Sequence, residues 1–292
     1  MSKTDKKILF ESSKAVLIHR IGNLAINQTD SIIVATFIDV SSWGLMGNYL
    51  LIRKSAQMLG DSLYAGILPS MGNLVATQDK RKHIDVFLKY DFLNFIFYTF
   101  CFVMMGMLAT PFVSLLFGNK YVVDNLTVFF MLLAFFIDGL RNPVSSLRES
   151  SGNFIKDRWF TSLAAIVNLI ISVGLVGRYK IIGIYIGTIS AMIVLHILRS
   201  VTLFGKTYDY SSFQYLLKIA IHIIYGCSVY FIIFLITKSV IGENINVNSF
   251  VFKGLIALLL FIIITYVTFR RNKYMDEIIQ ELLTKVKKGI KR

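Results

Sequence analysis

Long apolar stretches make up most of the chain, and short polar segments separate them. A helix of about 20 apolar residues crosses the hydrocarbon core of a bilayer, so each stretch is a candidate membrane-spanning helix. The pattern predicts about eight transmembrane helices, and therefore an all-α polytopic membrane protein. Their expected positions are residues 15–38, 45–74, 86–117, 122–147, 159–177, 181–204, 213–237 and 250–269.

Composition agrees with this prediction and excludes an ordinary soluble domain. Hydrophobic residues make up 55% of the chain and charged residues 16%, against roughly 25% charged residues in soluble proteins. The formal net charge of +14 could suggest nucleic acid binding. However, the basic residues cluster in the short segments between apolar runs, which is typical of membrane topology signals. We therefore expect no nucleic acid partner.

The basic residues also predict an orientation in the membrane. Most lie at the N-terminus, in alternate connections between the predicted helices, and in the tail. The opposite connections hold only Lys120, Arg178, Lys180, Lys238 and Lys253. Because positively charged segments stay in the cytoplasm, both termini are expected there. The tail sequence MDEIIQELLTKVKKGI predicts an amphipathic helix, which would lie on the anionic inner leaflet or pack against protein.

Polar residues inside the first predicted helix fall on one face. The stretch RIGNLAINQTDSIIVATFI, residues 20–38, places Arg20, Asn23, Asn27 and Asp30 at spacings of 3, 4 and 3. At about 100° per residue, these four side chains lie within one quadrant of a helix. The segment is therefore interpreted as a membrane helix with one polar face.

Two further helices repeat this arrangement. The second predicted helix carries Arg53, Gln57, Asp61 and Tyr64 along one face, with Lys54 beside them. Its Pro69 is expected to kink or end it. The polar face of the fourth predicted helix holds Asp138, Arg141, Asn142, Ser145 and Glu149.

Charged side chains that face lipid are costly, so polar faces on three helices suggest a shared polar cavity. Two other interpretations remain. Charges on one helix could pair with each other, as Asp138 could with Arg141 one turn later. Side chains near a membrane surface, such as Arg53 and Lys54, could instead extend to water.

The remaining chemistry is sparse. No nucleotide-binding, metalloprotease or paired-cysteine motif occurs, and the four histidines lack the spacing of metal ligands. We expect neither an enzyme nor a bound metal or cofactor. Cys101 and Cys227 lie in apolar runs and resemble buried hydrophobic residues. Gly183, Gly187 and Ala191 are four residues apart, which predicts close packing of two helices.

Three segments carry a resemblance to a known family. The stretch RIGNLAINQTDSIIVATFI, the segment WGLMGNYLLI and the turn ILPSMGNLVA resemble bacterial polysaccharide repeat-unit flippases of the multidrug/oligosaccharidyl-lipid/polysaccharide exporter superfamily. Such flippases have about 12–14 spans, in two six-helix lobes around a central cavity. The resemblance assigns residues 1–205 to the second lobe, 206–269 to two additional helices and 270–292 to a basic cytoplasmic tail. The first lobe is expected on another chain, or the chain is a truncated flippase.

The resemblance implies a function. Such proteins carry undecaprenyl-pyrophosphate-linked oligosaccharides across the bacterial cytoplasmic membrane, for capsule, exopolysaccharide or O-antigen synthesis. Cations suit the pyrophosphate, and the candidates are Arg20, Arg53 and Lys54. Hydrogen-bonding side chains suit the sugars, and the candidates are Asn23, Asn27, Gln57 and Tyr64. Coupling to an ion gradient would need a carboxylate, and the candidates are Asp30 and Asp61.

Other functions stay open at this point. A drug exporter of the same superfamily would favour an acidic cavity, whereas the first two helices hold more bases than acids. A non-transporting remnant or an assembly subunit would account for the absent first lobe. A membrane enzyme would need a large outer loop or a cluster of reactive residues, and neither is found in the sequence.

Overall fold

The computed structural model describes residues 40–152, 159–208, 210–242 and 246–280, together with residues 10, 13, 17, 30, 32–34 and 36–38. Within these ranges the structure is helical and contains no strand. The elements are α2 (Val40–Thr77), α3 (Lys80–Phe117), the 3₁₀ turn η1 (Asn119–Tyr121), α4 (Asn125–Gly139), α5 (Asn142–Ser150), α6 (Phe160–Tyr179), α7 (Ile181–Thr207), α8 (Ser212–Ile241) and α9 (Val247–Phe269).

The all-helical fold class and the multi-pass membrane character are confirmed. Among the described residues, six segments are long and apolar enough to cross a bilayer: α3, the α4–α5 segment, α6, α7, α8 and α9. The first of the eight predicted spans lies largely outside the described residues. The second corresponds to α2, which is long enough to span but carries Arg53, Lys54 and Asp61 and is not among the six.

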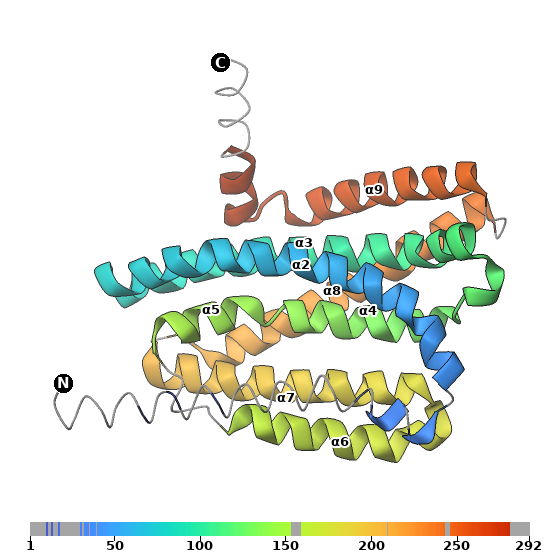
Figure 1. Ribbon diagram of the computed structural model, residues 1–292. Coiled ribbons are helices and arrows are strands. Elements are labelled where there is room, and N and C mark those ends of the chain that lie inside the picture. The colour runs from blue at the N-terminus through green and yellow to red at the C-terminus, as the bar shows by residue number, and fades with distance from the viewer. Residues whose placement is uncertain are drawn as a thin grey trace.

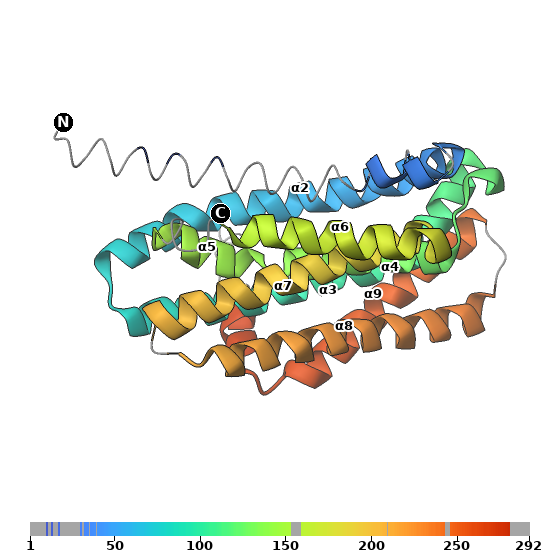
Figure 2. The ribbon, with the colours of Figure 1, turned by 90° about the horizontal axis from the view of Figure 1, so that it is seen from below.

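Successive long helices run in alternating directions and lie side by side, as Figures 1 and 2 show. The α2–α3 connection, which directly precedes Lys80, therefore lies at the same end of the bundle as the α5–α6 and α7–α8 connections (Figure 1). The α3–α4, α6–α7 and α8–α9 connections lie at the opposite end. This alternation is the one that the distribution of basic residues predicted.

Local sequence sets the ends of these helices. Asp79 and Asp124 cap α3 and α4 by accepting backbone N–H groups of Lys82 and Thr127. These caps satisfy donors that the first turn of a helix leaves free. Gly118 and Gly242 end α3 and α8 with φ angles of 93° and 73°, a region that glycine enters without steric cost.

Proline acts differently at two positions. The prediction was that Pro69 kinks or ends its helix. Helix α2 continues through Pro69 to Thr77, so Pro69 does not end it. The fourth predicted helix is instead divided into α4 and α5, with Pro143 in the first turn of α5. Proline lacks the N–H that would continue the helix, and its ring clashes with the preceding turn. The sequence therefore contained a break that hydropathy alone did not reveal.

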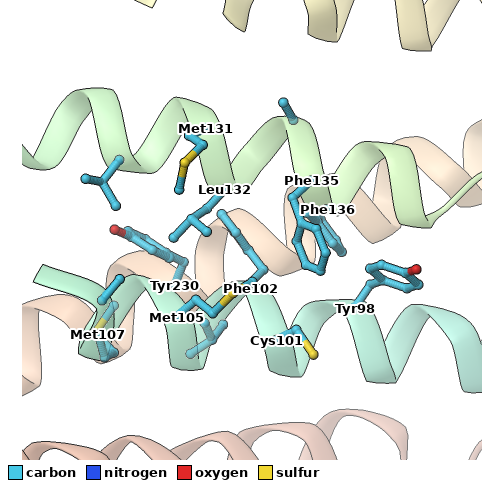
Figure 3. Packing of buried hydrophobic residues seen from close by; sticks show 14 of the residues in the cluster. Tyr98, Cys101, Phe102, Met105, Met107, Met131, Leu132, Phe135, Phe136 and Tyr230 are labelled. Atoms are coloured by element: carbon cyan, nitrogen blue, oxygen red, sulfur yellow. The ribbon is translucent and has the colours of Figure 1, made fainter. Parts of the chain in front are cut away.

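An aromatic cluster forms the centre of the bundle, where α3, α4 and α8 meet (Figure 3). The fully buried Phe102 ring stacks on Phe136 and on Tyr230, with centroid distances of 5.1 and 5.0 Å. Gly226 allows α8 to approach this cluster, because a Cβ atom there would lie 2.6 Å from the Phe136 ring. The core of the fold is therefore built by large rings packed against small residues.

The small residues of α7 pack closely against α6, as their spacing predicted. A Cβ atom at Gly183 would lie 2.8 Å from the backbone of Leu175, and one at Gly187 would lie 2.9 Å from the carbonyl oxygen of Asn168. Ala191 is fully buried beside Ala164. Small side chains at these positions let the two backbones come together.

The described part of the tail packs against protein. Residues 273–280 are helical, and Lys273 pairs with Asp85 of α3 at 3.2 Å. Glu277 pairs with Lys89, also of α3, at 3.3 Å. Of the two interpretations of the tail, packing against the bundle therefore describes residues 273–280. The basic residues from Lys285 onward lie outside the described ranges.

Candidate functional site

A polar cavity of about 360 Å³ opens between α2 and α7. Its lining includes Asp30, Arg53 and Gln57, which belong to the two predicted polar faces, and Asp138 from the third. Among the described residues, the lining consists of Asp30, Trp43, Leu50, Arg53, Gln57, Asp138, Tyr185, Thr188 and Met192. The structure thus brings together residues from all three predicted polar faces at one cavity.

Asp30 is held by two neighbouring helices. The Thr188 hydroxyl on α7 lies 3.2 and 3.1 Å from the two carboxylate oxygens of Asp30. The Asn168 amide on α6 donates to the Thr188 oxygen at 3.0 Å. Since the hydroxyl accepts from Asn168, its own proton is available to Asp30. The close packing at Gly187 is what brings α6 near enough for this chain of contacts.

Arg53 is the cation among the described residues that line the cavity. It extends from α2, half-buried, and its charge acts on Asp30. The Arg53 Nε atom is buried and has no hydrogen-bond partner within the described ranges. A guanidinium group carries five N–H donors, and a buried donor without a partner costs free energy. Arg53 therefore has unused capacity to bind an anionic or strongly polar ligand.

The other polar residues of the α2 face do not all lie at the cavity. Gln57 lines the cavity and donates to Asp61 at 2.9 Å. Asp61 itself is exposed, as is Lys54, and neither lines the cavity. Tyr64 lies nearer α5, where it donates to Glu149 at 2.7 Å. Of the five candidates on this helix, only Arg53 and Gln57 therefore meet at the cavity.

The polar residues of the α4–α5 segment have partners both within the segment and on neighbouring helices. Arg141 pairs with Asp138 at 2.6 Å, as the interpretation of internal pairing predicted. Asn142 donates to the hydroxyl of Tyr98 at 3.0 Å. Asp138 nevertheless lines the cavity. Both interpretations of Asp138, internal pairing and a place in the cavity, thus apply to this residue.

Three predicted site residues cannot be placed, and two residues of the cavity were not predicted. Arg20, Asn23 and Asn27 lie outside the described residues. The sequence analysis did not select Tyr185 or Thr188 of α7 as site residues. They are three residues apart in the largely apolar first half of α7, and this short polar face was the signal that could have identified them.

Comparisons with known proteins add no assignment. Neither the scan against models of protein families nor the searches of curated proteins and of solved structures found a match to this chain.

Proposed function

We propose that this chain forms part of a transporter that moves a lipid-linked oligosaccharide with a pyrophosphate group across the bacterial cytoplasmic membrane. The observation that carries the proposal is the polar cavity inside a bundle of membrane-spanning helices, with Arg53 on its wall. Ionisable groups placed inside a membrane bundle typically mark the path of a substrate or an ion. The resemblance of the sequence to repeat-unit flippases supplies the substrate class.

The charges around the cavity favour an anionic group beside Arg53. Asp138 is already neutralised by Arg141, and Asp30 is in hydrogen-bonding contact with Thr188. Arg53 retains a buried donor without a described partner. A phosphate oxygen would accept from this guanidinium in a geometry that arginine favours. Gln57 and Tyr185 would then offer hydrogen bonds to an adjoining sugar.

The size of the cavity suggests what it would hold. A volume of about 360 Å³ lies at the lower end of the range of about 300–1,000 Å³ for small-molecule sites. We expect it to bind the phosphate group and the first sugar. A second lobe on another chain would enclose the remaining sugars. In this proposal both termini face the cytoplasm, as the positive-inside pattern predicts.

Binding can be tested without the second lobe, because one of the two tryptophans lines the cavity. The Trp159→Phe variant leaves Trp43 as the only tryptophan, so its fluorescence reports on the cavity. The purified full chain in detergent is titrated with a short polyprenyl pyrophosphate that carries one sugar, and separately with the corresponding polyprenol. We expect saturable binding of the pyrophosphate compound alone.

In this background, Arg53→Gln should lower the affinity for the pyrophosphate compound roughly tenfold or more, because a charge-assisted hydrogen bond is lost. Arg81→Gln removes the same charge from an exposed position on α3 and should leave the affinity unchanged. Equal affinity of the Arg53 variant and wild type would refute the proposed phosphate contact. Equal binding of the polyprenol would refute the substrate class.

A further inference from the structure

A second cavity shares no described lining residue with the polar one and contains two lysines. It measures about 280 Å³ and is enclosed by α3, α8 and α9. Lys238 comes from the last turn of α8 and Lys253 from the second turn of α9. Thr110, Asn125 and Ser249 add neutral polar groups, and no carboxylate is among the described residues of the lining. Lys238 and Lys253 flank the α8–α9 connection, which lies at the end of the bundle opposite to the α2–α3 connection (Figure 1).

Lys253 is the unusual member of this pair. It lies inside a segment that is apolar enough to cross the membrane, and its side chain is partly buried. Within the described part of the chain, Lys253 has no ion pair and no hydrogen bond. A lysine at this depth is unfavourable unless it reaches water or meets an anion. The cavity therefore offers a site where an external anion would compensate the charge.

Two acids are close to this cavity in the sequence. Asp124 precedes Asn125, but its carboxylate caps α4 by accepting from Thr127, and it lines a different cavity. Glu243 belongs to the α8–α9 connection at positions outside the described ranges. The described lining of the lysine cavity therefore does not include Asp124.

An apolar groove begins beside the lysines. It measures about 550 Å³ and runs between α2, α3 and α9, with Leu51, Leu108 and Leu116 on its walls. Phe250 of α9 lines both the groove and the lysine cavity, and its ring contacts Phe112 of α3 at 6.4 Å between centroids. Leu51 and Leu116 are more than 60% exposed, so in the membrane this groove faces lipid chains.

We propose that the lysine cavity binds the phosphate of an anionic phospholipid, whose acyl chains lie in the adjoining groove. Ammonium groups bind phosphate oxygens as point charges, and the apolar groove suits hydrocarbon chains. The combination distinguishes a lipid phosphate from a soluble one, because a soluble anion gains nothing from the groove. This inference concerns a site apart from the polar cavity and does not depend on the proposed substrate.

Native mass spectrometry of the purified full chain in mild detergent tests the proposal. The protein is titrated with phosphatidylglycerol, with phosphatidylcholine and with inorganic phosphate, and the lipid-bound fraction is measured. We expect wild type to prefer phosphatidylglycerol over both other probes. Lys253→Gln should lower the affinity for phosphatidylglycerol roughly tenfold or more, since a hydrogen-bonded charge is lost. Lys238→Gln should also lower the affinity for phosphatidylglycerol.

Lys120→Gln is the matched control, because Lys120 lies at the same end of the bundle but outside the cavity. It should bind phosphatidylglycerol as wild type does. Equal losses in the Lys120 and Lys253 variants would show general charge attraction and overturn the site. Binding of inorganic phosphate as tight as that of phosphatidylglycerol would overturn the lipid assignment. Glu243→Gln should bind phosphatidylglycerol at least as tightly as wild type, and weaker binding would also contradict the proposal.

Discussion

Replacing Lys218 by methionine should destabilise the helix bundle strongly, because the substitution removes the cation that faces a buried carboxylate. The Asp91 side chain on α3 is 2% exposed, and the Lys218 ammonium on α8 lies 2.7 Å from its Oδ2 atom. The Tyr215 hydroxyl, which is also buried, donates to Oδ1 at 3.0 Å. This pair connects two helices that lie apart in the sequence.

The expected magnitude follows from which partner remains buried. Removing one member of a buried ion pair typically costs about 3–5 kcal/mol, since the other charge is left uncompensated. After Lys218→Met, Asp91 keeps only the hydrogen bond from Tyr215, so we expect a loss within that range. After Asp91→Asn the loss should be smaller, about 1–3 kcal/mol. The Lys218 side chain is 27% exposed, so its ammonium can extend toward water.

Unfolding of the purified protein in mixed micelles, as the fraction of sodium dodecyl sulfate is raised, measures these differences. The double variant Asp91→Asn/Lys218→Met completes a double-mutant cycle. Its loss should be less than the sum of the single losses, because no unpaired charge remains. The difference from additivity gives the interaction energy of the pair.

A second lysine–aspartate pair, between the tail and α3, supplies the control. Lys273 and Asp85 are 3.2 Å apart, but their side chains are 65% and 45% exposed. Water and salt screen such a pair, so Lys273→Met should have a much smaller effect than Lys218→Met. If the two substitutions destabilise the protein equally, burial of Asp91 does not control the energetics and the reasoning is refuted.

Two further predictions concern packing, and the same unfolding assay measures both. Gly187→Ala should lower the free energy of unfolding by about 1–3 kcal/mol, because the new methyl group overpacks against α6. Gly174→Ala is the control, since nothing lies within 4 Å of its new Cβ atom, and it should be neutral or slightly stabilising. Equal effects of the two substitutions would contradict close packing at Gly187. Phe102→Ala should lose about 3–5 kcal/mol by emptying the centre of the aromatic cluster, whereas Phe213→Ala, at a residue 75% exposed, should lose little. A Phe102 variant as stable as the Phe213 variant would contradict the central place of this ring.

The polar faces show how far sequence reasoning reached for the candidate site. Helical spacing placed Arg53, Gln57, Asp61 and Tyr64 on one face, but it could not say which part of that face meets α7. In the structure, Arg53 and Gln57 line the cavity, whereas Asp61 is exposed. The angle at which two helices cross decides this, and it depends on the side chains of both helices at their contact.

The sequence by itself determined the helical class, the six apolar segments that are candidate spans among the described residues, and the alternation of the connections between them. A bilayer requires every backbone polar group in its core to be satisfied within the span, so local apolar length predicts structure reliably. The contact between Asp30 and Thr188 joins residues 158 positions apart, and the pair of Asp91 with Lys218 is similarly remote. Only the tertiary structure decided these contacts, because they depend on which helices become neighbours and on how closely small residues let them approach.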